Sequence, residues 1–238
     1  PDMLSEQGFA RAFSSFIGVK KGLRKFDVKK SGEKVIIEKS VKDVRPYTAC
    51  AIVKNLNFDD EKIKEIFPGV YEIEGRIVTK NLIKGNPVYS ERIFKQNAEE
   101  YRSWDPHRSK LSAAIKKGLK DIYIRQGDKV LYLGAATGTT SSHVSDIVGK
   151  KGVVYCIEFA PISFRKLINV CEKRENMVPI MGDARKPDMY TNVGDVDIIY
   201  EDVAQPDQAE ILLANCRYFL KKGGYAMIAV KSQSIDVT

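Results

Sequence analysis

The stretch that decides the fold reads Lys129-Val130-Leu131-Tyr132-Leu133-Gly134-Ala135-Ala136-Thr137-Gly138-Thr139-Thr140. A short apolar run, 130–133, is followed by a corner of small residues and then by a helix-like segment. Glycine and alanine at such a corner let a ligand approach the backbone closely. The pattern therefore predicts a strand, a ligand-binding turn and a helix. A purely steric glycine turn is the alternative reading of the corner.

Further apolar runs follow in the same rhythm, separated by amphipathic segments. They cover residues 153–157, 178–181, 196–200 and 225–230. Short apolar strands that alternate with helices are typical of a parallel sheet covered on both faces. The sequence thus predicts an α/β domain of Rossmann-like type, with its ligand at the carboxyl ends of the strands.

The part upstream of this domain has a different character. Residues 70–73, 76–79 and 88–94 alternate apolar and polar side chains between turn signals at 74–75 and 84–87, which predicts a small antiparallel sheet. Residues 109–119 have helical spacing, with Ser109 as the N-cap. Residues 9–17 are predicted to be helical, and 35–38 and 47–54 to be strands, but they form no complete domain pattern.

Acidic residues follow three successive strands of the predicted parallel sheet. Glu158 ends the second strand, Asp183 follows the third and Asp202 follows the fourth. A carboxylate at the second strand can accept hydrogen bonds from ribose hydroxyls, and Phe159 can lie against a base. Each acid alone could be an ordinary surface residue, but three on one edge indicate a nucleoside cofactor.

S-adenosylmethionine is a better fit for this cofactor than NAD. The two glycines of the corner, Gly134 and Gly138, have the spacing G-x-x-x-G, whereas a pyrophosphate site requires G-x-G-x-x-G. The acids near the fourth strand suit a sulfonium and an amino group. The predicted reaction is methyl transfer, with a nicotinamide-dependent oxidoreductase as a weaker alternative.

Two lysines can reach the same edge as Asp202. Lys110 begins the helix ahead of the first strand, and Lys231 follows the fifth strand. Such a lysine can take the proton of a ribose hydroxyl or stabilise the developing alkoxide. Either lysine alone would be read as a solvated surface charge, and only their combination with Asp202 points to catalysis.

Composition excludes several other classes of protein. The cysteines, at 50, 156, 171 and 216, are widely spaced, and the histidines are His107 and His143. Neither a disulfide framework nor a metal site is therefore predicted. No apolar run is long enough for a membrane span, and no secretory signal is seen, so we expect a cytoplasmic protein. The net charge of +8 is compatible with a phosphate-rich partner.

Several motifs resemble the fibrillarin family. Y-R-x-W-x-P-x-R-S-K-L at 101–111, the cofactor loop at 130–140, S-H-V-S-D-I at 142–147, Y-E-D-V-A-Q-P-D-Q at 200–208 and S-I-D-V-T at 234–238 are similar to that family's segments. The resemblance runs from about residue 67 to 238. Since no Gly/Arg-rich tail is present, it is to the archaeal form.

The resemblance implies a fold and a function. Residues 67–100 would form a small β domain and 101–238 a Rossmann-like methyltransferase domain. The family methylates ribose 2′-hydroxyls of rRNA, and by extension of tRNA, directed by box C/D guide RNA with a Nop-domain scaffold and a kink-turn-binding protein. Its catalytic residues correspond to Lys110, Asp202 and Lys231. Its cofactor residues correspond to Gly134, Ala136, Thr139, Thr140, Glu158, Phe159, Asp183, Ala184, Asp202 and Gln205.

Three departures from the family accompany the resemblance. The resemblance stops at Thr238, before the family's final helix and strands, so we expect a C-terminally truncated methyltransferase domain without a counterpart of the family's fourth catalytic residue, a histidine. A non-catalytic, truncated module of a ribonucleoprotein is therefore the alternative function. Gln233 stands where the family has arginine, which would weaken RNA contacts. Residues 1–66 instead resemble a fragment of the archaeal phenylalanyl-tRNA synthetase β subunit, with the similarity at 1–12 and 43–53. We therefore expect a chimera joined near 62–66. Its first part is expected to pack poorly and to have no activity.

Overall fold

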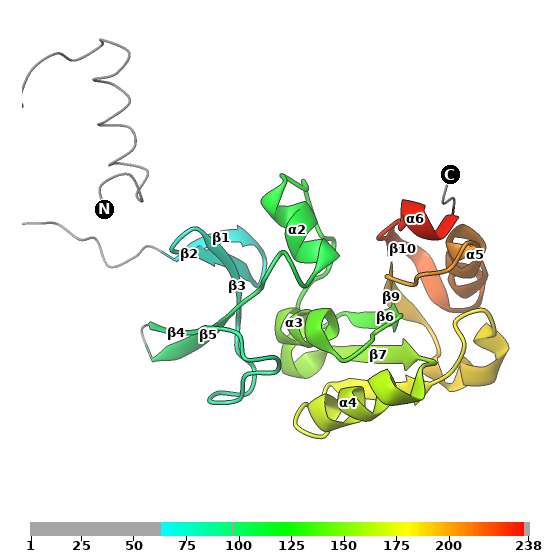
Figure 1. The fold of residues 1–238 in the computed structure, drawn as a ribbon, viewed down its shortest axis with the longest axis horizontal. Helices are drawn as coiled ribbons and strands as arrows, with labels where there is room; N and C mark the ends of the chain where they lie inside the picture. Colours follow the sequence, from blue (N-terminus) through cyan, green and yellow to red (C-terminus); the bar gives the residue numbers. More distant parts are fainter. Residues whose placement is uncertain (1–62, 97, 236–238) are drawn as a thin grey trace, which may run out of the picture. The chain divides into compact units, whose positions relative to one another are not determined.

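The computed structural model describes residues 63–96 and 98–235, whose strands form two sheets of five (Figure 1). The helix predicted at 9–17 and the strands predicted at 35–38 and 47–54 lie outside the described residues. So does most of the segment that resembles the synthetase.

The first sheet is antiparallel, as predicted. Its strands have the order β1-β2-β3-β5-β4, and they are β1 (Lys64–Phe67), β2 (Val70–Ile73), β3 (Arg76–Lys80), β4 (Ile93–Gln96) and β5 (Glu99–Ser103). Glu74 and Gly75 join β2 to β3 with φ of 51° and 69°. This pair of left-handed residues matches the twist of a tight hairpin.

Two details of this sheet differ from the prediction. The strand expected at 88–94 begins only at Ile93, because the preceding residues fold around the Glu91 carboxylate. This carboxylate accepts the backbone N–H groups of Val88, at 2.9 Å, and Tyr89, at 2.7 Å. Strand β5 was not predicted, since its sequence E-E-Y-R-S is polar, yet Glu100 and Arg102 are buried in it.

The second sheet is parallel and confirms the predicted α/β domain. Its order is β10-β9-β6-β7-β8, with β6 (Lys129–Leu133), β7 (Val153–Glu158), β8 (Met177–Met181), β9 (Val196–Glu201) and β10 (Leu220–Ile228). The predicted fifth strand, 225–230, was misplaced: β10 begins at Leu220 and its register shifts before Tyr225. Gly223, with φ of 83°, permits this irregularity.

Helices cover both faces of the parallel sheet (Figure 1). Helices α2 (Lys110–Lys116), α3 (Thr139–Val148) and α4 (Pro161–Cys171) contribute Leu111, Val144 and Leu167 to the core on one face. Helix α5 (Gln208–Phe219) and the 3₁₀ segment η4 (Pro187–Val193) contribute to the other. The chain also forms η3 (Gly149–Lys151) and α6 (Ser232–Ile235). Ser109 caps α2 through the backbone N–H of Ser112, as predicted.

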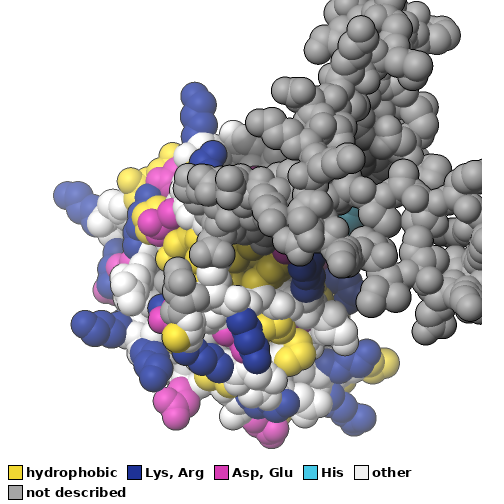
Figure 2. Space-filling view, turned by 90° about the vertical axis from the view of Figure 1, so that its left-hand side faces the viewer, with side chains coloured by type: hydrophobic (Ala, Val, Ile, Leu, Met, Phe, Trp, Pro, Cys, Tyr) yellow, Lys and Arg dark blue, Asp and Glu magenta, His cyan; other side chains and the backbone are white. Residues whose placement is uncertain are grey.

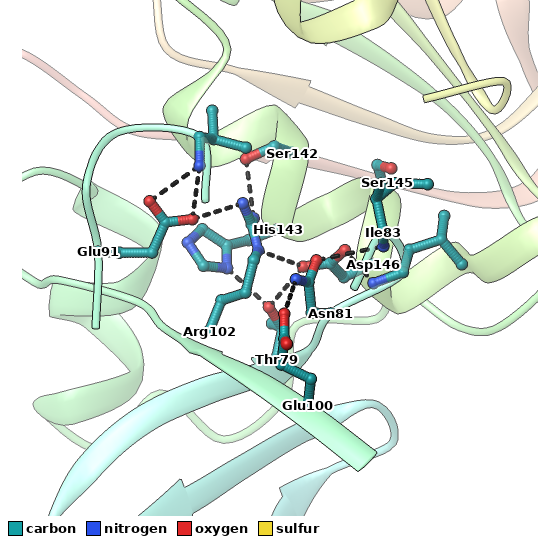
Figure 3. Close-up of polar contacts among 12 residues, drawn as sticks. Thr79, Asn81, Ile83, Glu91, Glu100, Arg102, Ser142, His143, Ser145 and Asp146 are labelled. Atoms are coloured by element: carbon teal, nitrogen blue, oxygen red, sulfur yellow. Dashed lines mark hydrogen bonds and ion pairs between the residues drawn. The ribbon is translucent and has the colours of Figure 1, made fainter. Parts of the chain in front are cut away.

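A buried polar network joins the two sheets through α3 (Figure 3). Arg102 of β5 donates hydrogen bonds to Asp146 at 2.9 Å, Glu91 at 2.7 Å and Ser142 at 2.9 Å. Arg174 donates to the other oxygen of Asp146 at 2.7 Å. Since each buried cation here meets a carboxylate, the network compensates its own charges and holds the antiparallel sheet on α3.

The order of the parallel strands locates the ligand edge. From β6 the chain runs outward to β7 and β8, then returns to the other side of β6 for β9 and β10. This reversal leaves a crevice at the carboxyl ends of β6 and β9, where open α/β sheets bind their ligands.

Candidate functional site

A cavity of about 400 Å³ lies at this crevice. Its wall brings together nine of the residues singled out in the sequence, namely Gly134, Ala136, Glu158, Phe159, Asp183, Ala184, Asp202, Gln205 and Lys231. They come from the ends of β6, β7, β8, β9 and β10, so segments far apart in the sequence share one pocket.

The corner after β6 is shaped by steric contact with the loop after β9. Gly134 has φ of 80°, and a Cβ placed on it would lie 2.9 Å from the carbonyl oxygen of Asp202. Only glycine permits this approach. The backbone N–H of Asp202 in turn donates to the Leu133 carbonyl at 2.9 Å. The two loops are therefore held together where the cavity begins.

The Glu158 side chain is fixed by the backbone around it. Its Oε2 accepts the Ala136 N–H at 2.8 Å, and its Oε1 accepts the Ala160 N–H at 2.8 Å. Each carboxylate oxygen keeps a further lone pair that can accept a hydroxyl hydrogen. The neighbouring Phe159 ring is 62% exposed, so it offers a free aromatic face at the cavity rim.

The opposite wall contains a cation that was not predicted from the sequence. Arg185 donates to Asp207, at 2.7 and 2.6 Å, and to the side-chain oxygen of Gln205 at 2.7 Å. The Arg185 guanidinium lowers the pKa of Asp207. Asp183 accepts the backbone N–H of Arg185 at 3.0 Å. The signal available in the sequence was a cation two residues after Asp183.

Asp202 lies between the two predicted lysines. Its Oδ1 is 2.9 Å from Lys110 Nζ and 3.1 Å from Lys231 Nζ, and Lys231 also donates to the Asp202 carbonyl at 2.9 Å. The Asp202 side chain is 14% exposed. One carboxylate thus holds two ammonium groups at the open edge of the cavity.

Two predicted cofactor residues do not line this cavity. Thr140 is buried and donates its hydroxyl hydrogen to Ser109 at 3.0 Å, while Thr139 lines a separate cavity beside α4. Both threonines are at the start of α3, directly after the glycine corner. Their contact with a cofactor stays a prediction.

Glu201, next to Asp202, is fully buried on the opposite face of β9. Neither of its carboxyl oxygens has a hydrogen-bond partner within residues 63–96 and 98–235. Burial, with a smaller contribution from the charge of Asp207, raises the pKa of Glu201 to about 8. The carboxyl group is therefore protonated in the folded chain at neutral pH.

This pKa makes the stability of the chain depend on pH. Between pH 4.5, the ordinary pKa of glutamate, and pH 8, the folded chain keeps a proton that the unfolded chain releases. The free energy of unfolding should therefore fall as the pH rises, by up to about 1.4 kcal/mol per pH unit. In Glu201→Gln this contribution should vanish, which urea unfolding at about pH 5, 6.5 and 8 would measure. Equal slopes for both chains would contradict the assignment.

The described part of the chain shows two further absences. It contains no group of three or more His, Cys, Asp or Glu side chains placed to hold a metal ion. None of its helices has the length and apolar character needed to cross a membrane.

His143 is buried with Trp104 stacked on it, and burial together with Arg102 and Arg174 lowers its pKa. Cys156 and Cys171 are buried free thiols, and Cys216 is half-buried.

Most of the chain is similar in sequence to known proteins of one family. The Fibrillarin family model matches residues 61–238. The fibrillarin-like rRNA/tRNA 2′-O-methyltransferase of Methanocaldococcus jannaschii is 57% identical over 186 residues, which are 76% of this chain and 80% of the relative.

Two solved structures are also similar. One is Aeropyrum pernix fibrillarin in complex with natively bound S-adenosyl-L-methionine, with a TM-score of 0.66, 53% identity, and coverage of 71% of this chain and 75% of that one. The other is a fibrillarin/Nop5p complex, with a TM-score of 0.68, 44% identity, and coverage of 74% and 80%. From residue 61 to its last residue, the chain belongs to the fibrillarin family.

Proposed function

We propose that this chain is an S-adenosylmethionine-dependent RNA 2′-O-methyltransferase that acts on rRNA, and on tRNA, under the direction of a box C/D guide RNA. One observation carries the proposal: Asp202 holds Lys110 and Lys231 at the edge of a cavity lined by the acids of three neighbouring strands. The relative in Methanocaldococcus jannaschii bears the name of this activity.

The residues of the cavity fit S-adenosylmethionine. Glu158 would accept the ribose hydroxyls, Phe159 would lie against the adenine, and Asp183 with Ala184 would meet the adenine edge. When bound, this cofactor supplies a methyl group activated by a sulfonium. Gly134 and Ala136 leave room for it close to the backbone, and Gln205 would contact its far end. The related protein of Aeropyrum pernix binds this molecule natively.

Lys110, Asp202 and Lys231 would carry the chemistry at the target ribose. The 2′-oxygen would form its bond to the methyl carbon while the carbon–sulfur bond breaks, leaving a neutral thioether. The 2′-hydroxyl loses its proton in this step, and the negative charge that develops on its oxygen must be stabilised. Two ammonium groups held by one carboxylate are suited to this, because fixed charges in a partly desolvated site need no reorganisation during the reaction. The proton can leave through Asp202 or through a lysine in its neutral form.

We also propose partners of the fibrillarin-family kind. A family member forms a complex with Nop5p, which supports a Nop-domain scaffold, and the named activity of the relatives makes rRNA and tRNA the substrates. A guide RNA and a kink-turn-binding protein would complete the particle. The relatives are archaeal, and we propose that this protein acts in the cytoplasm.

The cofactor assignment predicts a loss of affinity in two single variants. Glu158→Ala and Asp183→Ala should each weaken S-adenosylmethionine binding by at least about tenfold, because each removes a charged hydrogen-bond acceptor. Titration calorimetry measures this, with Glu175→Ala as the control, since Glu175 is exposed and outside the cavity. Unchanged affinity in both variants would count against the proposal, and tight binding of NAD instead would indicate the oxidoreductase.

A second experiment separates the enzyme from a non-catalytic module. The chain is combined with guide RNA, scaffold and kink-turn-binding protein, and methylated target RNA is measured with labelled cofactor. Methylation at the guided position is expected. Assembly of the particle without any methylated product would identify the chain as a structural module.

A further inference from the structure

A second groove, of about 510 Å³, lies between the antiparallel sheet and the segment that leads into α2. It is separate from the proposed cofactor cavity and shares no residue with it. Its wall includes the basic side chains Arg76, Arg92, His107, Arg108 and Lys116. In a view from the side on which β4 and β5 lie in Figure 1, Lys and Arg side chains project from much of the visible surface (Figure 2).

Three of the four Arg and Lys side chains in this groove form no ion pair within the described residues. Arg92 is paired with Glu74 at 2.6 and 2.9 Å. Arg76, Arg108 and Lys116 are exposed, and within the described residues none of them forms an ion pair. Of the carboxylates on the wall, Glu91 binds Arg102. Asp105 accepts the backbone N–H of His107 and forms no ion pair within the described residues, so it offsets one of these three positive charges. The groove therefore keeps a net positive charge and three cations without an ion-pair partner.

One of these cations is also held in place. The guanidinium carbon of Arg108 lies 5.6 Å from the centre of the Tyr89 ring, within the range of a cation–π contact. Tyr89 is itself fixed, because its hydroxyl donates to the Ser103 carbonyl at 2.9 Å. An arginine ordered in this way loses less entropy when it binds a ligand.

The groove begins next to the proposed catalytic centre. Arg108 is two residues before Lys110, so their Cα atoms are at most about 7 Å apart. Lys110 in turn touches Asp202. A polymer that places one ribose at Asp202 would therefore have Arg108 of the groove close to its neighbouring nucleotides.

We propose that this groove binds the sugar–phosphate backbone of the RNA strand that flanks the target ribose, through Arg76, Arg108 and Lys116. This inference rests on the proposed function. Arginine and lysine bind phosphates without reading base sequence, as a protein needs when base pairing with a guide selects the target. An acidic protein surface is the competing ligand, and the test includes it.

The experiment measures binding of a fluorescent RNA duplex of arbitrary sequence at KCl concentrations from about 50 to 200 mM. The variant combines Arg76→Ala, Arg108→Ala and Lys116→Ala. We expect binding at least about tenfold weaker at the lower salt, and a slope of log affinity against log salt reduced by roughly 2–3, about one for each phosphate that the variant no longer neutralises.

The matched control combines Lys151→Ala, Arg217→Ala and Lys222→Ala, which removes the same charge from exposed positions outside the groove. Equal weakening in the two triple variants would overturn the proposal, since only net charge would matter. Polyglutamate that competes as well as unlabelled RNA would also overturn it and point to an acidic protein. Calorimetry with S-adenosylmethionine separates this proposal from the proposed function. The groove variant is expected to bind the cofactor with unchanged affinity. If the unchanged chain binds RNA but no cofactor, only the proposed function is contradicted.

Discussion

Asp202→Asn is expected to lower the rate of methyl transfer by about 10²–10⁴-fold, the range of a positioned acid–base group. Asparagine keeps the size of the side chain but removes the charge that holds two ammonium groups within 3.1 Å. Lys110 and Lys231 would then repel one another and move away from the target ribose. The measurement is single-turnover methylation of guided RNA with labelled cofactor, in the reconstituted particle.

Asp197→Asn is the control for this variant. Asp197 lies at the other end of the same strand and also pairs with a lysine, Lys221, at 2.9 Å. Its replacement should leave the methylation rate near that of the unchanged chain. A rate in Asp202→Asn within about twofold of the control would show that the carboxylate does not take part in the reaction, since a general acid–base group contributes far more than that.

Arg102→Met is expected to lower the free energy of unfolding by about 3–5 kcal/mol, as is typical when one partner of a buried ion pair is removed. Arg102 is fully buried, and its guanidinium contacts both Asp146 and Glu91 (Figure 3). Without it, Arg174 still pairs with Asp146, but the buried carboxylate of Glu91 has lost its ion-pair partner. Urea unfolding at neutral pH measures the loss.

Arg92→Met tests whether the loss comes from burial. Arg92 forms an equally short ion pair with Glu74, but its side chain is 52% exposed. Exposed pairs contribute at most about 1 kcal/mol, because water screens them. The two substitutions remove the same group, one from β5 and one from the residue directly before β4. Similar losses in both variants would therefore contradict the role given to the buried network.

The parallel sheet was predictable because its central strands bury both faces. The runs that begin with Val130 and Val153 are apolar throughout, and such runs have few alternatives in a domain of this size. Glu158 directly follows the second of these runs, and Asp202 lies two residues after the run 196–200, so their convergence at one edge could also be predicted. The distances between these acidic side chains could not be predicted, because they depend on the order of the strands in the sheet.

Strand β5 shows why other parts could not be predicted. Its residues Glu100 and Arg102 are charged, and local patterns assign charged residues to the surface. They are buried because Asp146, Asn81 and Glu91 approach from other elements and compensate them. The position of β4 was misjudged for a related reason, since Glu91 binds the backbone that would otherwise continue the strand.

The sequence by itself determined the type of domain, the edge where a ligand binds and the residues that meet there, because hydrophobic periodicity and the glycine corner are local properties of the chain. Tertiary structure alone decided that Arg185 joins the cavity wall, that Thr139 and Thr140 do not line it, and that Arg108, two residues before Lys110, lines a basic groove. Each of these depends on side chains from elements distant in sequence, whose approach is set by packing and by the compensation of buried charge.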